Sequence, residues 1–340
     1  MKKVLIIAEA GVNHNGDIEL AKKLIDAATE AQVDYVKFQS FRADNLVSPI
    51  AKKAKYQMKN IGNEDDFQYE MLKNLELSDE DHIVLITYCK KKNIKFFSTA
   101  FDVDGVSYLS SLGLDLFKIP SGELTNFPYL RAIGQTKKPV ILSTGMADLQ
   151  DIKAAIDVLI FFGTKKEQLT VLHCNTEYPT PMQDVNLHAM SSIKEEFDVA
   201  IGYSDHTLGI EVPIAAVSLG AKVIEKHFTL DRNFKGPDHK ASLEPKELKA
   251  MVDAIRNIEL ATSGDGLKKP SVSEQKNIHI ARKSIHLNKD MPEGTIISES
   301  DMIPLRPGDG ISPMEWNTII GKTVIRDLCK YEKLNWSDVS

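Results

Sequence analysis

The stretch that decides the fold runs from Val199 to Asp238 and reads VAIGYSDHTLG at 199–209, then a helical spacer, then KVIEKHFTLDRNFKGPD at 222–238. Its two short apolar runs end in polar residues, including His206 in the first and His227 in the second. In a βαβ unit, such runs form parallel strands whose carboxyl ends lie side by side. Both histidines would then face one cavity, and neutral imidazole is a good ligand for Mn, Fe, Co or Zn. The alternative is two unrelated histidines, one at a helix cap and one in the core.

The region before this stretch repeats the alternation of apolar runs and helical patterns. Six further strand-like runs occur at 4–11, 34–41, 95–102, 116–123, 139–146 and 169–177. Helical patterns separate them, and Ser78 with Asp81 resembles the opening of a helix over 78–93. The runs are apolar throughout, which is typical of strands buried on both faces of a parallel sheet. Eight βα units in roughly 260 residues predict an α/β fold of the (β/α)8 TIM-barrel type.

A doubly wound open sheet is the alternative fold for this alternation. Its dinucleotide-binding version carries a GxGxxG pattern directly after the first strand. The first apolar run, VLIIAEAG at 4–11, is followed by VNHNGD, which lacks that pattern. The sequence therefore favours the barrel.

The composition is that of an ordinary globular protein. The chain has 340 residues, 42% of them hydrophobic and 26% charged, which is enough for one large and one small domain. A formal net charge of −6 disfavours nonspecific nucleic-acid binding. No stretch approaches the roughly 20 apolar residues of a membrane helix, and the apolar N-terminal run is too short for a signal peptide. Three scattered cysteines indicate reduced thiols in a cytoplasmic protein.

A change of composition near residue 263 marks the end of the expected barrel. The segment SGDGLKKPSVSEQ, at 263–275, is rich in Gly, Ser, Pro and charge, which is typical of a linker. We therefore expect a barrel domain over 1–265, a linker over 266–284 and a small domain over 285–340. Short runs split by Pro and Gly predict that the small domain is β-rich and near the lower size limit for independent stability.

Chemically capable side chains end each strand-like run, and in a barrel these ends surround one active-site mouth. They include Glu9, Gln39, Thr99, Ser121, Glu123, Ser143, Asn175, Thr176, Tyr178 and Ser204. Lys37 and Lys118 differ from the others, because a lysine inside an apolar run must find an anion if it is buried. Two lysines and several hydroxyls suit a ligand that carries a phosphate and a carboxylate. Glu9 and Glu123 are the candidate acid–base groups.

The segment 42–77, between the second run and the helix opening at Ser78, is long and polar. We expect it to pass over the mouth of the barrel. It contains Tyr56, Gln57 and lysines within 52–55, and discrimination between substrates could reside there.

Nine motifs extend over almost the whole chain in a specific order. They are AEAGVNHNGD (8–17), VKFQSF (36–41), FKIPSGE (117–123), ILSTGM (141–146), LHCNTEYPTP (172–181), GYSDHTLG (202–209), IEKHFTLD (224–231), GPDHKASLEP (236–245) and RPGDGISP (306–313). They resemble the motifs of the nonulosonic acid synthases, which are the bacterial sialic acid synthases and the related N,N′-diacetyllegionaminic acid synthases. The tail is similar to an antifreeze-protein-like β-clip domain. The resemblance implies condensation of phosphoenolpyruvate with an N-acetylated mannose-type sugar and release of inorganic phosphate.

The resemblance also implies roles for single residues. The metal ligands would be His206 and His227. The groups that hold phosphoenolpyruvate would be Lys37, Thr99, Lys118, Ser121, Ser143 and Ser204. The groups that contact the sugar or the attacking water would be Glu9, Gln39, Glu123, Tyr178 and Asp238. The chain departs from the family where an asparagine is expected two residues before the tyrosine: Thr176 stands there and Asn175 one place earlier, so both remain candidates for the phosphoenolpyruvate pocket.

The resemblance further implies a divalent metal and a homodimer. We expect Mn²⁺, with Mg²⁺ or Co²⁺ as alternatives, because imidazole ligands with open positions favour such metals over Ca²⁺. In the dimer, Arg306 in the small domain of one chain would reach the barrel of the other and bind the acyl group of the sugar. Neither nucleic acid nor a membrane is an expected partner.

Three questions stay open at this level. A metal-dependent pyruvate aldolase or sugar isomerase on the same barrel is the alternative enzyme, and a carbohydrate- or ice-binding protein is the non-enzymatic alternative suggested by the tail. Both N-acetylmannosamine and 2,4-diacetamido-2,4,6-trideoxymannose are candidate acceptors, and the motifs resemble the diacetyllegionaminic branch somewhat more. Either Glu9 or Glu123 could activate water.

Overall fold

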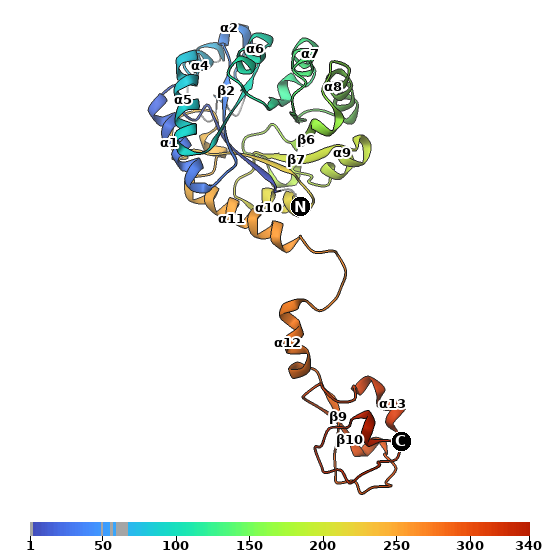
Figure 1. Ribbon diagram of the computed structural model, residues 1–340. Helices are drawn as coiled ribbons and strands as arrows, with labels where there is room; N and C mark the ends of the chain where they lie inside the picture. The colour runs from blue at the N-terminus through green and yellow to red at the C-terminus, as the bar shows by residue number, and fades with distance from the viewer. Residues whose placement is uncertain (1–2, 49, 55–56, 59–66) are drawn as a thin grey trace. The chain divides into compact units, whose positions relative to one another are not determined.

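Figure 1 shows the computed structural model of the chain, which describes residues 3–48, 50–54, 57–58 and 67–340. Eight parallel strands form one sheet in the N-terminal part. Their bounds are β1 Leu5–Gly11, β2 Tyr35–Ser40, β3 Lys95–Ala100, β4 Phe117–Ile119, β5 Val140–Ser143, β6 Leu169–Cys174, β7 Ala200–Asp205 and β8 Val223–His227. Each strand lies inside one of the apolar runs, so the predicted positions of the strands are confirmed.

The sheet is arranged as a barrel. The strand order is β3-β2-β1-β8-β7-β6-β5-β4, so each strand lies beside its neighbour in sequence and the first strand pairs with the last. At the remaining seam β3 and β4 are in contact, although no strand ladder joins them in the described part of the chain. This circular order is that of a (β/α)8 barrel and excludes the doubly wound alternative.

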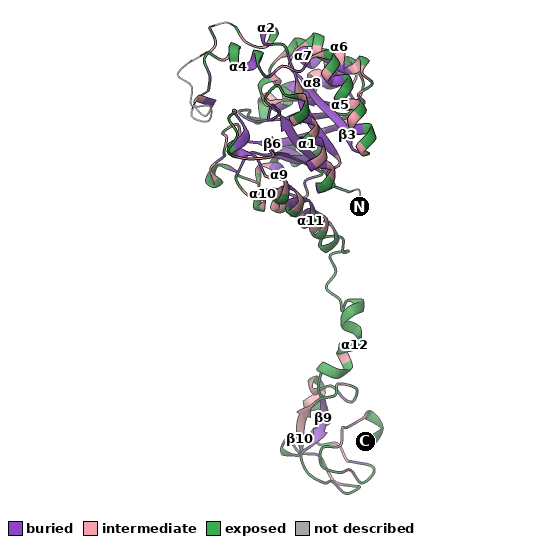
Figure 2. Cartoon of the chain, turned by 90° about the vertical axis from the view of Figure 1, so that its left-hand side faces the viewer, coloured by how far each residue is buried: buried purple, intermediate pink, exposed green. Residues whose placement is uncertain are grey.

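Helices follow the strands and pack on the outside of the barrel. The main ones are α1 Ile18–Ala31, α5 Asp79–Lys92, α6 Val103–Ser111, α7 Phe127–Gln135, α8 Leu149–Phe161, α9 Ala189–Phe197, α10 Glu211–Ser218 and α11 Pro245–Ala261. Their apolar faces join the sheet in one continuous core, and Figure 2 shows exposed residues on their outer faces. The predicted opening of α5 is a capping box between Ser78 and Asp81. No described helix is long and apolar enough to cross a membrane.

A smaller core closes the barrel at the amino ends of the strands. It consists of the inward-facing residues Ile7, Tyr35, Phe97, Ile141, Leu172 and Val223. On β7 this level is occupied by Gly202, where a Cβ would lie 2.4 Å from the carbonyl oxygen of Val223. Because side chains alternate along a strand, the next inward residues lie one layer closer to the carboxyl ends. That layer is where the polar residues of the strand ends meet.

The segment after β2 carries two short helices, α2 Ala43–Leu46 and α4 Tyr69–Lys73. Leu72 and Leu75 pack with Val12 in an apolar cluster of their own. Of the residues singled out in this segment, Lys55 and Tyr56 lie outside the described residues.

The chain divides into two compact units, Met1–Ser263 and Gly264–Ser340. The second contains α12 Val272–Ala281, β9 Ser284–Leu287, β10 Met302–Leu305 and α13 Trp316–Ile319. The two strands pair antiparallel, and isolated bridges extend the β structure around a separate apolar core. The helix α12 lies within the expected linker. It begins with a capping box between Ser271 and Glu274, which corresponds to the sequence pattern of a serine followed three residues later by a glutamate.

Candidate active site

A cavity of about 570 Å³ opens at the carboxyl ends of the barrel strands, and every strand contributes to its lining. Its polar lining residues are Glu9, Lys37, Gln39, Gln57, Thr99, Lys118, Ser121, Ser143, Cys174, Thr176, Glu177, Tyr178, Ser204, His206, Glu225, His227 and Asp238. Ala54, Met71, Leu72 and Leu75 also line it, so the segment 42–77 does pass over the mouth. Most residues predicted from the strand ends therefore meet in one place.

The register of the strands explains why these side chains meet. Glu9 on β1 lies in register with Lys37 on β2 and with His227 on β8. Ser204 on β7 lies in register with Glu225 on β8. Residues in register on parallel strands point to the same face, so this layer of the barrel interior is polar.

Glu225 is the centre of a buried ion-pair network. Its Oε1 lies 2.7 Å from Nζ of Lys118 and accepts a hydrogen bond of 3.1 Å from Ser204, while its Oε2 lies 3.7 Å from Nζ of Lys37. Lys37 also lies 2.8 Å from Oε2 of Glu9. An anion for the two lysines was predicted from the sequence, but Glu225 was not predicted as a site residue. The sequence does contain a signal for Glu225 as a site residue, since it is an acidic residue inside an apolar run, two positions before His227.

Burial and pairing shift the pKa values of these groups in different directions. Burial opposes the ionisation of Glu225, but the charges of Lys118 and Lys37 outweigh it and lower the pKa of its carboxyl. Burial raises the pKa of Glu9, and the charge of Lys37 opposes this only in part. Burial also lowers the pKa of Lys118 despite its contact with Glu225. A carboxyl group that lines a cavity and has a raised pKa is a candidate for proton transfer. Glu9 meets both conditions.

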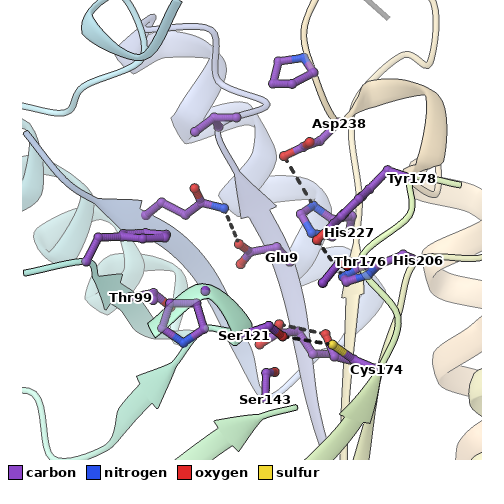
Figure 3. A pocket seen from close by; sticks show the side chains of 18 of the residues that line it. Glu9, Thr99, Ser121, Ser143, Cys174, Thr176, Tyr178, His206, His227 and Asp238 are labelled. Carbon is purple, nitrogen blue, oxygen red and sulfur yellow. Dashed lines mark hydrogen bonds and ion pairs between the residues drawn. The ribbon is translucent and has the colours of Figure 1, made fainter. Parts of the chain in front are cut away.

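His206 and His227 lie side by side, with ring centroids 5.3 Å apart (Figure 3). This was predicted from their positions after two neighbouring parallel strands. The Nδ1 of His206 donates to the carbonyl oxygen of Asn175, and its Nε2 accepts a hydrogen bond of 3.0 Å from the hydroxyl of Tyr178. The Nδ1 of His227 lies 4.0 Å from Oδ2 of Asp238. Burial lowers the pKa of both imidazoles, that of His206 to about 4, so both are neutral near pH 7.

The two histidines fit a divalent metal. Metal ligation requires a neutral imidazole, and the bond from His206 to the Asn175 carbonyl fixes its tautomer. The buried Nδ1 of His227 has no hydrogen-bond partner among the described residues, which is uncommon for a buried polar atom. The described residues contain no group of three or more His, Cys, Asp or Glu side chains arranged to hold a metal, so a metal bound here would need further ligands from elsewhere.

Two serines supply hydroxyls to the same cavity lining as Lys118. Ser121 accepts a hydrogen bond of 3.0 Å from the N–H of Gly145, while the buried hydroxyl of Ser143 has no partner among the described residues. A Cβ at Gly145 would lie 2.5 Å from Thr176, so only glycine allows this close approach. A hydroxyl without a protein partner in the same cavity as a lysine suits an anionic oxygen.

Asn175 and Thr176 were both candidates for the phosphoenolpyruvate pocket. Thr176 lines the cavity, whereas Asn175 is not among the described lining residues. The side-chain oxygen of Asn175 accepts a hydrogen bond of 2.8 Å from the N–H of Glu177, and its carbonyl binds His206. Asn175 therefore orients a lining residue, and its predicted contact with a ligand stays a prediction.

Glu123 is not among the described residues that line the cavity. Glu123 is half-buried, where burial raises its pKa, and it accepts a hydrogen bond from Asn126. Arg306 belongs to the second unit, where its Nε donates to the carbonyl oxygen of Ala281 at 3.0 Å. Of the two candidate acid–base groups, only Glu9 lines the cavity.

Comparison with known proteins finds a matching family profile for each of the two parts of the chain. The NeuB family profile matches residues 24–268, and the SAF domain profile matches residues 282–340. The N,N′-diacetyllegionaminic acid synthase of Campylobacter jejuni is 55% identical over 327 residues, which is 96% of this chain and 97% of that protein. The enzyme of the same name from Legionella pneumophila is 50% identical over 336 residues, covering 98% of this chain and 94% of that protein.

Solved structures agree with this assignment. The N-acetylneuraminic acid synthetase of Leptospira borgpetersenii is 35% identical with a TM-score of 0.70, covering 82% of this chain and 90% of that one. The resemblance inferred from the nine motifs is therefore confirmed. With a profile match over most of its length and relatives at 50% identity or above, the chain belongs to the NeuB family and ends in a SAF, antifreeze-like, domain.

Proposed function

We propose that this chain condenses phosphoenolpyruvate with 2,4-diacetamido-2,4,6-trideoxymannose, forming N,N′-diacetyllegionaminate and inorganic phosphate. The observation that carries the proposal is one cavity that holds two buried lysines, several hydroxyls and two neutral histidines. The choice of sugar rests on the two relatives with this activity in their names, which match this chain over nearly its whole length.

The lysine side of the cavity suits phosphoenolpyruvate. Its phosphate and carboxylate would lie against Lys37 and Lys118, with Thr99, Ser121, Ser143 and Ser204 donating hydroxyl hydrogens. Charge-assisted hydrogen bonds of this kind are about twice as strong as neutral ones. Glu225 already holds both lysines in place, so their ammonium groups need little rearrangement to receive the ligand.

The histidine side suits the reacting end of the open-chain sugar. A divalent metal, Mn²⁺ in our proposal, would be held by His206 and His227, and when bound it would polarise the sugar aldehyde as a Lewis acid. Tyr178, Gln39 and Asp238 lie around the two imidazoles or beside Glu9 and would hydrogen-bond the sugar. These contacts would bring the aldehyde carbon close to carbon 3 of phosphoenolpyruvate.

The bond forms between carbon 3 of phosphoenolpyruvate and the aldehyde carbon, and positive charge develops at carbon 2. Water adds at carbon 2, and Glu9 takes its proton, which its raised pKa favours. The tetrahedral intermediate then loses inorganic phosphate by cleavage of the C–O bond, and its carbon 2 hydroxyl becomes the ketone. Of the two protons of the added water, one ends on the former aldehyde oxygen and one on the phosphate. Lys37 and Lys118 neutralise the phosphate during these steps.

We further propose that the active form is a cytoplasmic homodimer in which Arg306 of one chain completes the sugar site of the other. All three cysteines are free thiols, which agrees with a reducing compartment. Arg306 lies in the compact second unit, which has its own apolar core and can therefore act as a cap.

A phosphate-release assay tests the proposed reaction. Purified protein with Mn²⁺ and phosphoenolpyruvate should release phosphate only when the acceptor sugar is added, and mass spectrometry should find one nine-carbon product per phosphate. An aldolase would instead turn over pyruvate and the sugar without releasing phosphate. Turnover with pyruvate, or none with phosphoenolpyruvate and either sugar, would contradict the proposal.

A further inference from the structure

The cavity is apolar on one side of its mouth. Val12, Met71, Leu72, Leu75 and Phe101 line it there, and we refer to these five residues as the mouth wall. They belong to one apolar cluster in which Val12, Leu72 and Leu75 are buried and the other two are half-buried. The cluster is separate from the main core, so its packing gives the wall a fixed position beside the cavity.

The mouth wall lies above the charged layer of the barrel. Glu9 and Thr99 lie inside β1 and β3, whereas Val12 and Phe101 come just after the ends of those strands. The other three members come from α4 and from the turn after it. The wall therefore faces the outer part of a ligand whose reacting end lies among the lysines and histidines.

The nearby polar residue Gln57 is already engaged by its own segment. Its Oε1 accepts hydrogen bonds from the N–H of Ala54 at 2.9 Å and from Nε2 of Gln68 at 3.2 Å. Among the described residues, a sugar hydroxyl placed against the wall would therefore lose its hydrogen bonds to water without a matching acceptor in the five side chains of the wall or at Oε1 of Gln57. An unpaired polar group in such a place is disfavoured.

The two candidate sugars differ at their outer ends. N-acetylmannosamine carries hydroxyls on carbons 4 and 6, whereas the trideoxy sugar carries an acetamido group on carbon 4 and a methyl group on carbon 6. The aldehyde at carbon 1 must meet phosphoenolpyruvate near the lysines, so carbons 4 to 6 point to the mouth. Methyl groups gain free energy against an apolar wall, whereas hydroxyls do not.

We propose that the mouth wall, and Met71 and Val12 in particular, selects an acceptor whose carbon 6 carries a methyl group in place of a hydroxyl. The inference rests on the proposed synthase function and adds the residues that choose between its acceptors. It adds apolar residues of the same mouth to Tyr56, Gln57 and the lysines of 52–55, whose part in substrate discrimination stays a prediction.

The test compares kcat/KM for the two sugars by phosphate release. Met71→Gln has nearly the same length but is polar, and Val12→Thr replaces one methyl group by a hydroxyl. Each should lower the preference for the trideoxy sugar about tenfold, the usual effect of one methyl-sized contact in a pocket. The KM for phosphoenolpyruvate should stay near the wild-type value, because that ligand would lie below the wall.

Two controls separate selectivity from general damage. Met71→Leu keeps the wall apolar and should retain the preference. Met182→Gln makes the same chemical change at an exposed methionine outside the cavity lining and should leave the preference unchanged. Circular dichroism of each variant checks that it is folded.

The possible outcomes are distinguishable. An unchanged preference in both polar variants would overturn the role of the wall while the proposed function stands. A wild-type preference for N-acetylmannosamine would overturn the role of the wall and the proposed acceptor, while condensation with phosphoenolpyruvate stands. Absence of phosphate release by the wild-type chain with either sugar would overturn the proposed function itself. A preference that falls in both polar variants and survives in both controls supports the inference.

Discussion

At the scale of single residues, the charge of the cavity depends on Glu225. This carboxylate contacts both lysines and offsets one of their two positive charges. Glu9 offsets the other only when it is ionised, and burial raises its pKa. Lys37 and Lys118 thus place positive charge in the cavity, although the whole chain carries a formal net charge of −6.

Replacing Lys118 by alanine should weaken phosphoenolpyruvate binding or turnover and leave sugar binding nearly unchanged. Losing one charge-assisted contact costs on the order of 1.5–3 kcal/mol. Steady-state kinetics with each substrate varied in turn measures this. Lys137→Ala, an exposed lysine just before β5 at the amino end of the barrel, is the matched control. Unchanged kinetic constants for phosphoenolpyruvate would remove Lys118 from the site.

Chelation should abolish turnover, and Mn²⁺ should restore it best among added divalent metals. His206→Ala and His227→Ala should each lose bound metal and turnover together, because the two neutral imidazoles are the proposed protein ligands. Metal content by mass spectrometry and circular dichroism separate loss of metal from loss of fold. Full activity of verified metal-free protein would show that no metal is needed.

At the scale of elements, a buried ion pair joins the carboxyl ends of β7 and β8. Lys226 contacts Asp205 and the carbonyl oxygen of Thr207, and both charged side chains are fully buried. Asp205 precedes His206 and Lys226 precedes His227, so the same register that pairs the charges also sets the two imidazoles side by side. The outward-facing pair thus fixes the strands that carry the inward-facing histidines.

Replacing Lys226 by methionine should lower the free energy of unfolding by about 3–5 kcal/mol, because the substitution leaves a buried carboxylate without its partner. Urea denaturation measures the loss. Lys222→Met, an exposed lysine just before the same strand, is the control and should change stability little. Equal stabilities of the two variants would show that the pair contributes nothing to joining the strands.

At the scale of the whole molecule, the chain consists of a barrel unit and a small unit, each with its own apolar core. The only predicted site residue in the small unit is Arg306. The segment from residue 264 to the start of α12 at Val272 leads from the barrel unit into the small unit. The proposal that Arg306 serves a neighbouring chain can be tested by mixing mutant chains.

A mixture of Arg306→Ala and His206→Ala chains should regain activity after subunit exchange, although each variant is inactive alone. If sites are shared, the heterodimer has one site with both lesions and one intact site, and the activity per heterodimer approaches half the wild-type value. If each small unit caps its own barrel, every site keeps one lesion. Exchange verified by native mass spectrometry without recovery would rule out shared sites.

The sequence by itself determined the barrel, the positions of its strands and the pairing of His206 with His227. Apolar runs and helical periods are local patterns, and the carboxyl ends of neighbouring parallel strands must meet. The capping boxes at Ser78 and Ser271 are local signals of the same kind. Local patterns of this type are readable without knowledge of the neighbours in space.

Only the tertiary structure decided how the polar residues pair. Glu225 lies 107 positions from Lys118, and their contact depends on the register and tilt of strands far apart in the chain. The backbone at Asn175 is likewise held by a long-range contact, because its carbonyl oxygen accepts a hydrogen bond from His206, while Thr176 lines the cavity. The mouth wall likewise combines residues from the ends of β1 and β3 with residues around α4. Such contacts arise from closure of the barrel, because closure brings together side chains that no local period relates.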